Sequence, residues 1–174
     1  LDIPKDKSKI VPDSTSNDSE KCGEKLTYTF SSGTLTISGN GNMYDYWPPY
    51  SHPPWESYKN SIINLVVNEG VTSIGDCTFE YSTTLQSVTL PQSISKIGTA
   101  AFKQCTSLTP FTIPTSVTKI SNSVFEGCNF QYFTIPDSIT EILNGAFNSC
   151  QNLLTFTIPS SVMKLENSIF KYCS

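Results

Sequence analysis

Apolar and polar positions recur with a fixed period over the C-terminal part of the chain. The periodic aromatic residues are Phe79, Phe102, Phe125, Phe147 and Phe170, which lie 23, 23, 22 and 23 residues apart. A proline follows with the same period at 91, 114, 136 and 159. Cysteine stands three residues after a periodic phenylalanine in four copies: Cys105, Cys128, Cys150 and Cys173. One period shared by several residue types is typical of a repeat protein.

Each repeat contains one short predicted strand. Ahead of every periodic proline lies a triplet in which threonine separates two apolar residues: Val88-Thr89-Leu90, Phe111-Thr112-Ile113, Phe133-Thr134-Ile135 and Phe156-Thr157-Ile158. Such alternation points the apolar side chains inward and the threonine outward, and proline ends the strand because it has no N–H to donate. A unit of about 23 residues cannot bury its own apolar face, so the units are expected to stack, with their strands in one parallel sheet.

The sequence divides into three predicted parts. Residues 1–20 are polar, contain two prolines and predict a flexible leader. Residues 21–61 predict an N-terminal cap, in which 26–30 and 34–37 alternate around a Ser-Ser-Gly turn as in a β-hairpin, followed by an aromatic, proline-rich loop. Residues 62–174 predict five repeats of 22 or 23 residues. The last repeat is truncated where a following strand would begin, so we expect a longer natural protein or a shortened chain.

The repeats resemble the BspA-like leucine-rich-repeat surface protein family. Leu85–Cys105 and Leu153–Cys173 carry the pattern L-x-x-V-T-I-P-x-S-V-x-x-I-G-x-x-A-F-x-x-C, and Cys22–Gly41 is similar to the hairpin cap that precedes such repeats. The resemblance implies an α/β-type solenoid: a right-handed leucine-rich-repeat coil with a parallel β-sheet on one face, short helical turns or loops on the other, and an N-terminal β-hairpin cap. It also implies an extracellular or cell-surface protein that binds host or microbial macromolecules and brings no catalytic residues.

The sequence departs from this pattern in three places. The first copy, 62–84, has Asn68 in the place of the proline and Ser82 in the place of the cysteine. The third copy is one residue short near Asn129. Cys77 lies outside the periodic cysteine positions.

Composition and charge exclude several function classes. The chain has 11 lysines, no arginine and a net charge of −4, which argues against nucleic-acid binding, since phosphate and base recognition lean on arginine and a positive field. A single histidine, His52, removes most histidine-based catalysis. No apolar run approaches the length of about 18 residues that a membrane-spanning helix needs. The acidic residues Glu80, Glu126, Asp137, Glu141 and Glu166 do not recur in phase and are interpreted as solvated turn residues.

The cysteines favour a structural interpretation. Stacked copies would place the four periodic thiols within bridging distance, but with parallel Cβ vectors that oppose a disulfide. No Cys-x-x-Cys spacing accompanies His52, so neither a zinc site nor any other cofactor is expected. We therefore expect buried, reduced thiols that act as small apolar side chains. Whether Cys22 and Cys77 form a bridge or stay free is left open by the sequence, as is glycosylation at the Asn17-Asp18-Ser19 sequon.

Candidate ligand contacts lie on the outward side of the strands and in the cap loop. The predicted outward positions are Thr89, Thr112, Thr134 and Thr157, with Tyr132 as the one aromatic anchor among them. In the loop, Trp55 is expected to plug the end of the solenoid, whereas Trp47, Tyr50 and His52 are candidates for ligand contact. A threonine column has a purely structural interpretation too, because β-branched residues suit strands. No carboxylate pair occupies these positions, so no general acid–base machinery is expected.

These features favour a non-catalytic binding or adhesion module that recognises a protein or glycan. The alternative is a structural spacer, with binding carried by parts beyond residue 174. An enzyme is disfavoured, because no set of nucleophile, base and orienting group can be assembled from one histidine. The expected location is extracellular or at the cell surface, and the expected state is a monomer unless copies stack end to end at the truncated C-terminus.

Overall fold

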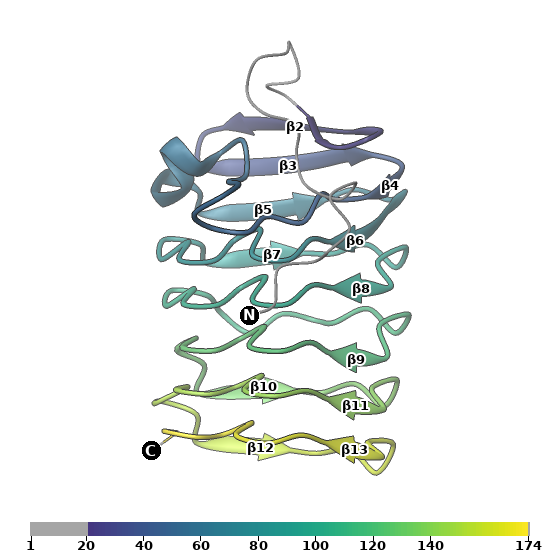
Figure 1. Cartoon of the computed structure of the whole chain (residues 1–174), viewed down its shortest axis with the longest axis vertical. Helices are drawn as coiled ribbons and strands as arrows, with labels where there is room; N and C mark the ends of the chain where they lie inside the picture. The colour runs from purple at the N-terminus through teal and green to yellow at the C-terminus, as the bar shows by residue number, and fades with distance from the viewer. Residues whose placement is uncertain (1–20, 174) are drawn as a thin grey trace.

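The computed structural model describes residues 21–173, and the chain forms an elongated solenoid (Figure 1). A β-hairpin lies at the N-terminal end, and the repeats stack below it along the long axis. The predicted leader at 1–20 and the sequon at Asn17 lie outside the described residues.

The cap is a hairpin whose second strand continues into the repeats. Strand β1 is Lys21–Gly23, β2 is Leu26–Ser31 and β3 is Thr34–Gly39, and β2 pairs antiparallel with both neighbours. β3 then pairs in parallel with the first repeat strand, with Leu35 opposite Leu65. Gly39 closes the cap with φ of 119°, and a Cβ there would lie 2.0 Å from the Lys25 carbonyl oxygen, so only glycine fits.

The repeats present two strand-bearing sides. The first side carries β5 (Asn64–Val67), β7 (Ser87–Thr89), β10 (Tyr132–Thr134) and β12 (Thr155–Thr157). The second side carries β6 (Val71–Ile74), β8 (Lys96–Ile97), β9 (Lys119–Ile120), β11 (Glu141–Ile142) and β13 (Lys164–Leu165), preceded by β4 (Gly41–Asn42) of the cap. All pairings between repeats are parallel. The expected parallel solenoid is therefore present, with first-side strands that begin one residue before the predicted triplets.

The third side consists of tight turns rather than helices. Each turn holds two residues in the left-handed backbone region four positions apart, and only two of these ten residues are glycine: Cys77 and Tyr81, Ala100 and Gln104, Ser123 and Gly127, Gly145 and Ser149, Ser168 and Tyr172. A left-handed residue interrupts a helix. The 3-10 helix η2 (Glu56–Ser61) precedes the repeats, and residues 62–173 contain no helix, so the α part of the expected α/β class is not seen.

A continuous column of aromatic rings runs through the core. The Trp55 ring of the cap stacks on the Phe79 ring with an interplanar angle of 11°. The fully buried members of the column are Trp55, Phe79, Phe102, Phe125 and Phe147. The ring centroids are 5.4 Å apart for Trp55 and Phe79, 5.6 Å for Phe79 and Phe102, 6.1 Å for Phe102 and Phe125, 5.4 Å for Phe125 and Phe147, and 5.9 Å for Phe147 and Phe170. Trp55 therefore takes, in the cap, the place that the periodic phenylalanine takes in each repeat.

The periodic cysteines form a column of their own beside the rings. Each thiol lies 3.1 or 3.2 Å from the backbone carbonyl oxygen of the phenylalanine one repeat earlier, and donates to it: Cys105 to Phe79, Cys128 to Phe102, Cys150 to Phe125 and Cys173 to Phe147. All six cysteines of the chain, which lie within 21–173, are free thiols, Cys22 and Cys77 included. Burial raises the pKa of the Cys105 and Cys150 thiols to about 12.

Charged residues form a third column, along the turns, which the sequence analysis missed. Lys103 Nζ lies 3.7 Å from a carboxylate oxygen of Glu80 and equally far from one of Glu126, and all three side chains are less than a quarter exposed. Glu80 and Glu126 therefore do recur in phase, two repeats apart, with a lysine between them. They are partners in a partly buried ion-pair triad rather than solvated turn residues.

The last repeat is open on one side within the described chain. Ile158 and Leu165 are 39% and 50% exposed, whereas their counterparts one repeat earlier, Ile135 and Ile142, are buried. The difference arises because no described residue stacks on the far side of this repeat.

Replacing Phe125 by alanine should cost about 3–5 kcal/mol of unfolding free energy, the usual loss for a fully buried phenylalanine. The phenyl ring contacts rings above and below, so the loss should spread to both neighbouring repeats. Urea unfolding followed by circular dichroism measures it. Tyr50→Ala, at a position 74% exposed, is the control and should change stability by less than about 0.5 kcal/mol. A loss under about 1 kcal/mol for Phe125→Ala would contradict the column.

Alkylation of the native protein by iodoacetamide at about pH 8 should reach Cys173 first. Its thiol is partly exposed, whereas those of Cys105, Cys128 and Cys150 are buried. Desolvation raises the pKa of all four thiols, so little thiolate forms at this pH and the inner three should stay unmodified until the chain unfolds. Peptide mass spectrometry reads out the order of labelling, and early modification of Cys128 would contradict the buried column.

Candidate functional site

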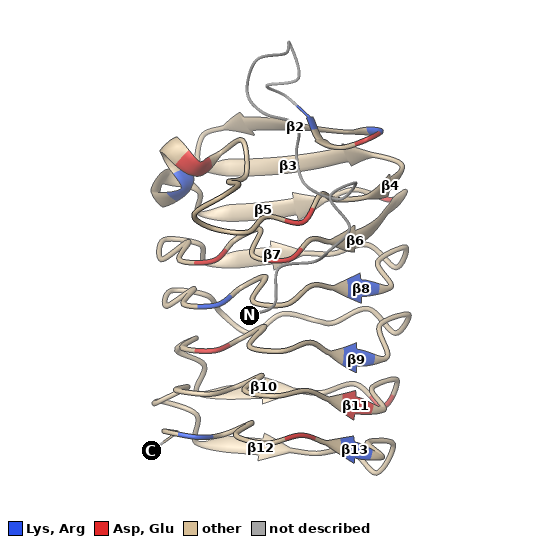
Figure 2. Cartoon of the chain, viewed as in Figure 1, with Lys and Arg blue, Asp and Glu red and all other residues tan. Residues whose placement is uncertain are grey.

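The outward positions of the first side form an exposed, uncharged face. Thr89, Thr112, Thr134 and Thr157 are all exposed, and Thr134 stands opposite Thr157 in the pairing of β10 with β12. The strands β3, β5, β7, β10 and β12 carry no charged residue (Figure 2). This face can donate and accept hydrogen bonds through hydroxyl groups, but it holds no group suited to acid–base chemistry.

The sheet on this face is interrupted in the third repeat, contrary to the continuous sheet expected from the sequence. The segment at 110–112, which corresponds to β7 and β10, forms no strand, so the first sheet ends at β7 and a separate sheet joins β10 to β12. Pro110 takes the position of Ser87 and Thr155 and cannot supply a backbone donor there. The N–H groups of Phe111 and Thr112 make no hydrogen bond to any residue within 21–173.

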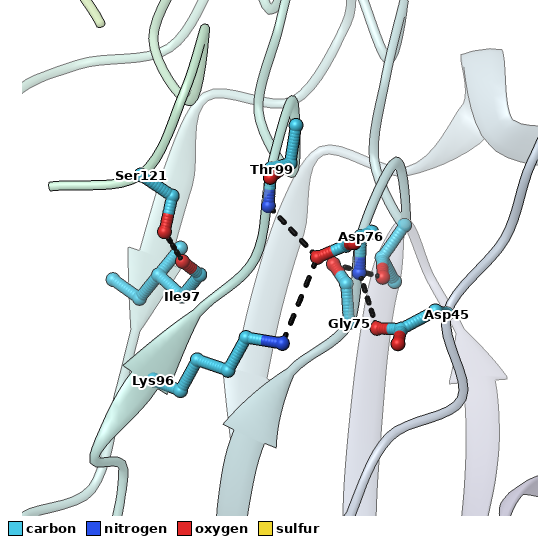
Figure 3. Close-up of polar contacts among 8 residues, drawn as sticks. Asp45, Gly75, Asp76, Lys96, Ile97, Thr99 and Ser121 are labelled. Carbon is cyan, nitrogen blue, oxygen red and sulfur yellow. Dashed lines mark hydrogen bonds and ion pairs between the residues drawn. The ribbon is translucent and has the colours of Figure 1, made fainter. Parts of the chain in front are cut away.

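The second side is interrupted at the same level. β8 belongs to the sheet of β4 and β6, whereas β9 pairs with β11, and no pairing joins β8 to β9. Instead of a strand pairing between β8 and β9, the Ser121 hydroxyl donates a hydrogen bond to the Ile97 carbonyl oxygen (Figure 3). The turn side stays continuous here, because the N–H groups of Phe102 and Gln104 donate to the next repeat at 3.1 and 2.7 Å. The turns and the ring column therefore hold the second and third repeats together.

A hollow of about 560 Å³ opens on the first side beside this interruption. It is lined by Gln86 and by two segments that each follow a periodic cysteine and lead into the next strand position on the first side. These segments, called lead-ins here, are 106–110 for the third repeat and 129–132 for the fourth. Phe111 follows Cys105 by six positions, whereas Phe133 follows Cys128 by only five. The lead-in of the fourth repeat is therefore one residue shorter than that of the third, and the two segments do not stack in register. Leu108 and Phe130, 3% and 1% exposed, form an apolar floor, and polar residues form the rim.

Tyr132 stands at the edge of this hollow with its side chain 59% exposed. It is the sequence-predicted anchor of the face, and the structure brings it together with Gln86, Asn129 and Gln131, which the sequence analysis did not single out. The one-residue shortening near Asn129 and the proline at 110 were the available signals for this place. Neither signal alone shows which side chains surround the resulting hollow.

A second hollow, of about 630 Å³, lies where the cap meets the second side. Its charged residues are Glu24, Lys25, Asp45 and Lys96. The Asp76 N–H donates to Asp45 at 2.9 Å, and Asp76 in turn accepts from the Thr99 N–H at 2.9 Å, with Lys96 Nζ 3.8 Å away (Figure 3). These contacts tie the cap to the first two repeats, so Asp45 and Lys96 already serve a structural purpose.

The aromatic loop of the cap lies apart from Tyr132. Trp47 is half-buried, and its N–H donates to the Ser51 hydroxyl at 2.9 Å in a tight turn that leaves Tyr50 exposed. Trp55, expected as a plug, is fully buried in the ring column. Neither hollow is lined by Trp47, Tyr50 or His52, so the structure does not join the two sets of predicted contact residues into one site.

Neither a metal-binding cluster nor a membrane-spanning helix is found among residues 21–173. No group of three or more histidine, cysteine, aspartate or glutamate residues is arranged to hold a metal ion in this part of the chain. No helix among these residues is long and apolar enough to cross a membrane.

The stacked parallel strands, the repeat period and the capped end define a leucine-rich-repeat solenoid. The chain belongs to the BspA-type leucine-rich-repeat family, whose model, described as a leucine-rich-repeat region of six copies, matches residues 57–174. Comparison with curated proteins finds no match.

Two solved structures are similar to the chain. A leucine-rich repeat protein from Eubacterium ventriosum ATCC 27560 superposes with a TM-score of 0.67 at 26% identity, over 80% of this chain and 43% of its own. A leucine rich cell surface protein from Faecalibacterium prausnitzii A2-165 has a TM-score of 0.52 at 23% identity, over 88% of this chain and 52% of its own, and shows the fold alone. The chain thus spans about half the length of these neighbours.

Amide hydrogen exchange should reveal the interruption of the first side. The N–H groups of Phe111 and Thr112 should exchange at least about tenfold faster than those of Leu65 and Val66, which lie in a strand paired on both edges. Mass spectrometry or NMR measures the rates. Pro110→Thr, which supplies the N–H present at the equivalent Thr155, should reduce the difference. Equal protection in the unmodified chain would mean that the sheet is continuous in solution.

Proposed function

We propose that this chain is a non-catalytic binding module of an extracellular or cell-surface protein, and that it adheres to a protein or glycan through the first side of its solenoid. The observation that carries the proposal is the exposed, uncharged face of threonine columns with Tyr132 beside a hollow. An exposed aromatic residue next to a concavity is a common centre of binding energy.

The chemistry of the described side chains supports binding rather than catalysis. Several lysines and carboxylates of the turn side and the second side pair with each other, as Lys119 does with Glu141 at 2.9 Å and Lys103 with Glu80 and Glu126 at 3.7 Å. The inner thiols are held protonated by burial, which removes their nucleophilicity. The proposed location outside the cell or at its surface rests on the family to which the chain belongs.

A structural spacer is the second candidate. It is favoured by the unbroken ring and cysteine columns, which make a rod, and by the fact that the chain spans 43% of the length of its Eubacterium neighbour. In that case the ligand contacts would belong to other parts of the protein. The two candidates differ in whether this chain by itself binds any surface.

Adhesion of the chain displayed in many copies on beads should distinguish them. A face of a few repeats is small, so single-site affinity is expected to be weak and to increase with the number of copies. Beads are tested on immobilised extracellular-matrix proteins and glycans, and the number that remains bound after washing is counted. Tyr132→Ala should lower adhesion by about tenfold or more, as expected for a central aromatic contact. Salt should change adhesion only mildly, because the face is uncharged.

Tyr81→Ala is the matched control, because Tyr81 is 52% exposed and lies on the turn side. It should leave adhesion unchanged. Trp47→Ala reports separately on the cap loop. Adhesion insensitive to Tyr132→Ala would reject the first side as the site, and absence of adhesion to every surface would favour the spacer.

A further inference from the structure

The hollow beside Tyr132 combines three features that specify a ligand class: one exposed aromatic ring, a rim that includes, within the described chain, two free side-chain amides and exposed hydroxyl groups, and no charge. Its ten lining residues include no lysine, aspartate or glutamate. Within the described chain the side-chain amides of Gln86 and Gln131 make no hydrogen bond, and both residues are exposed. Thr106 and Ser107 add exposed hydroxyl groups at the same rim.

We propose that this hollow binds a neutral saccharide, with a sugar ring stacked on Tyr132 and its hydroxyl groups bonded to the amides of Gln86 and Gln131. The inference rests on the proposed binding function and names the ligand of its site. A pyranose ring has an apolar C–H face and a hydroxyl edge whose groups both donate and accept. The face of an aromatic ring matches the apolar C–H face of the sugar. A side-chain amide, with two N–H donors and one acceptor oxygen, matches the hydroxyl edge.

The size of the hollow agrees with this ligand. Its volume of about 560 Å³ lies within the range of about 300–1,000 Å³ typical of small-ligand sites. An acidic saccharide would find no cation to pair with its carboxylate, so its desolvation would go uncompensated.

The backbone at the hollow disfavours an added peptide strand. The Gln86 carbonyl oxygen already accepts from both the N–H and the hydroxyl of Thr109, at 2.9 and 2.8 Å. The Gln131 carbonyl accepts from the N–H groups of Leu154 and Thr155. The Phe111 ring points to the core, where it packs 6.0 Å from the Phe133 ring. The rim carbonyls of Gln86 and Gln131 are therefore already engaged, whereas their side-chain amides are free, within residues 21–173, to bind a ligand.

The test is titration of the full chain with fluorescently labelled cellohexaose, maltohexaose and mannohexaose, followed by fluorescence polarisation. At least one should bind, with an affinity that changes little between low and high salt. Tyr132→Ala should weaken it by about tenfold or more and Gln131→Ala by about fivefold, whereas Tyr132→Phe, which keeps the ring face, should bind nearly as the unmodified chain does. Tyr81→Ala, an exposed tyrosine on the turn side and away from the first side, is the matched control. Thermal unfolding checks that each variant is folded.

Four outcomes would overturn the inference, and only the last of them also rejects the proposed function. In the first, none of the three oligosaccharides binds, but the beads still adhere to enzymatically deglycosylated matrix protein. The chain would then be a protein-binding module without a saccharide site. Preferential binding of labelled hexagalacturonate would contradict a neutral ligand. Saccharide binding that survives Tyr132→Ala would place the sugar elsewhere. Absence of both saccharide binding and bead adhesion would reject the proposed function as well.

Discussion

Stacking of one aromatic ring per repeat is the interaction on which the rest of the structure depends. The rings lie 5.4–6.1 Å apart, wider than the spacing of about 4.8 Å between neighbouring strands. The widest step, between Phe102 and Phe125, is where pairing fails on both strand-bearing sides. The core thus stays continuous where the sheets do not.

The thiol column complements the rings at the level of the backbone. Each phenylalanine carbonyl that faces the next repeat is buried, and an unpaired buried acceptor would be costly. The cysteine of the following repeat supplies a weak donor in a small apolar side chain. In the first repeat Ser82 replaces the cysteine, and its buried hydroxyl has no hydrogen-bond partner among residues 21–173. The cysteine column therefore serves packing and hydrogen bonding at once, which fits free thiols better than a redox or metal-binding role.

Much of the fold could be predicted from residues that recur in phase. The positions of Phe102 and Phe125 predicted a buried column, and the prolines predicted where strands end, because a single period forces equal residues into equal environments. The turn side could not be predicted in this way. Its left-handed residues include Cys77, Ala100 and Ser123, whose side chains give no common signal for that conformation. The triad around Lys103 was missed because it alternates in sign, so acidic residues alone show no period.

The candidate site lies where the repeat period is interrupted. There is a physical reason for this position. Perfect repeats present the same side chains at the same spacing along the whole face, so a ligand would meet many equivalent, shallow positions. A distinct concavity needs two neighbouring lead-ins that do not stack in register. The shorter segment before Tyr132 and the proline at 110 create that mismatch, and the ring column tolerates it because its own contacts continue across the interruption. Specificity on such a face therefore arises from the irregular copy, while the regular copies provide the rigid support.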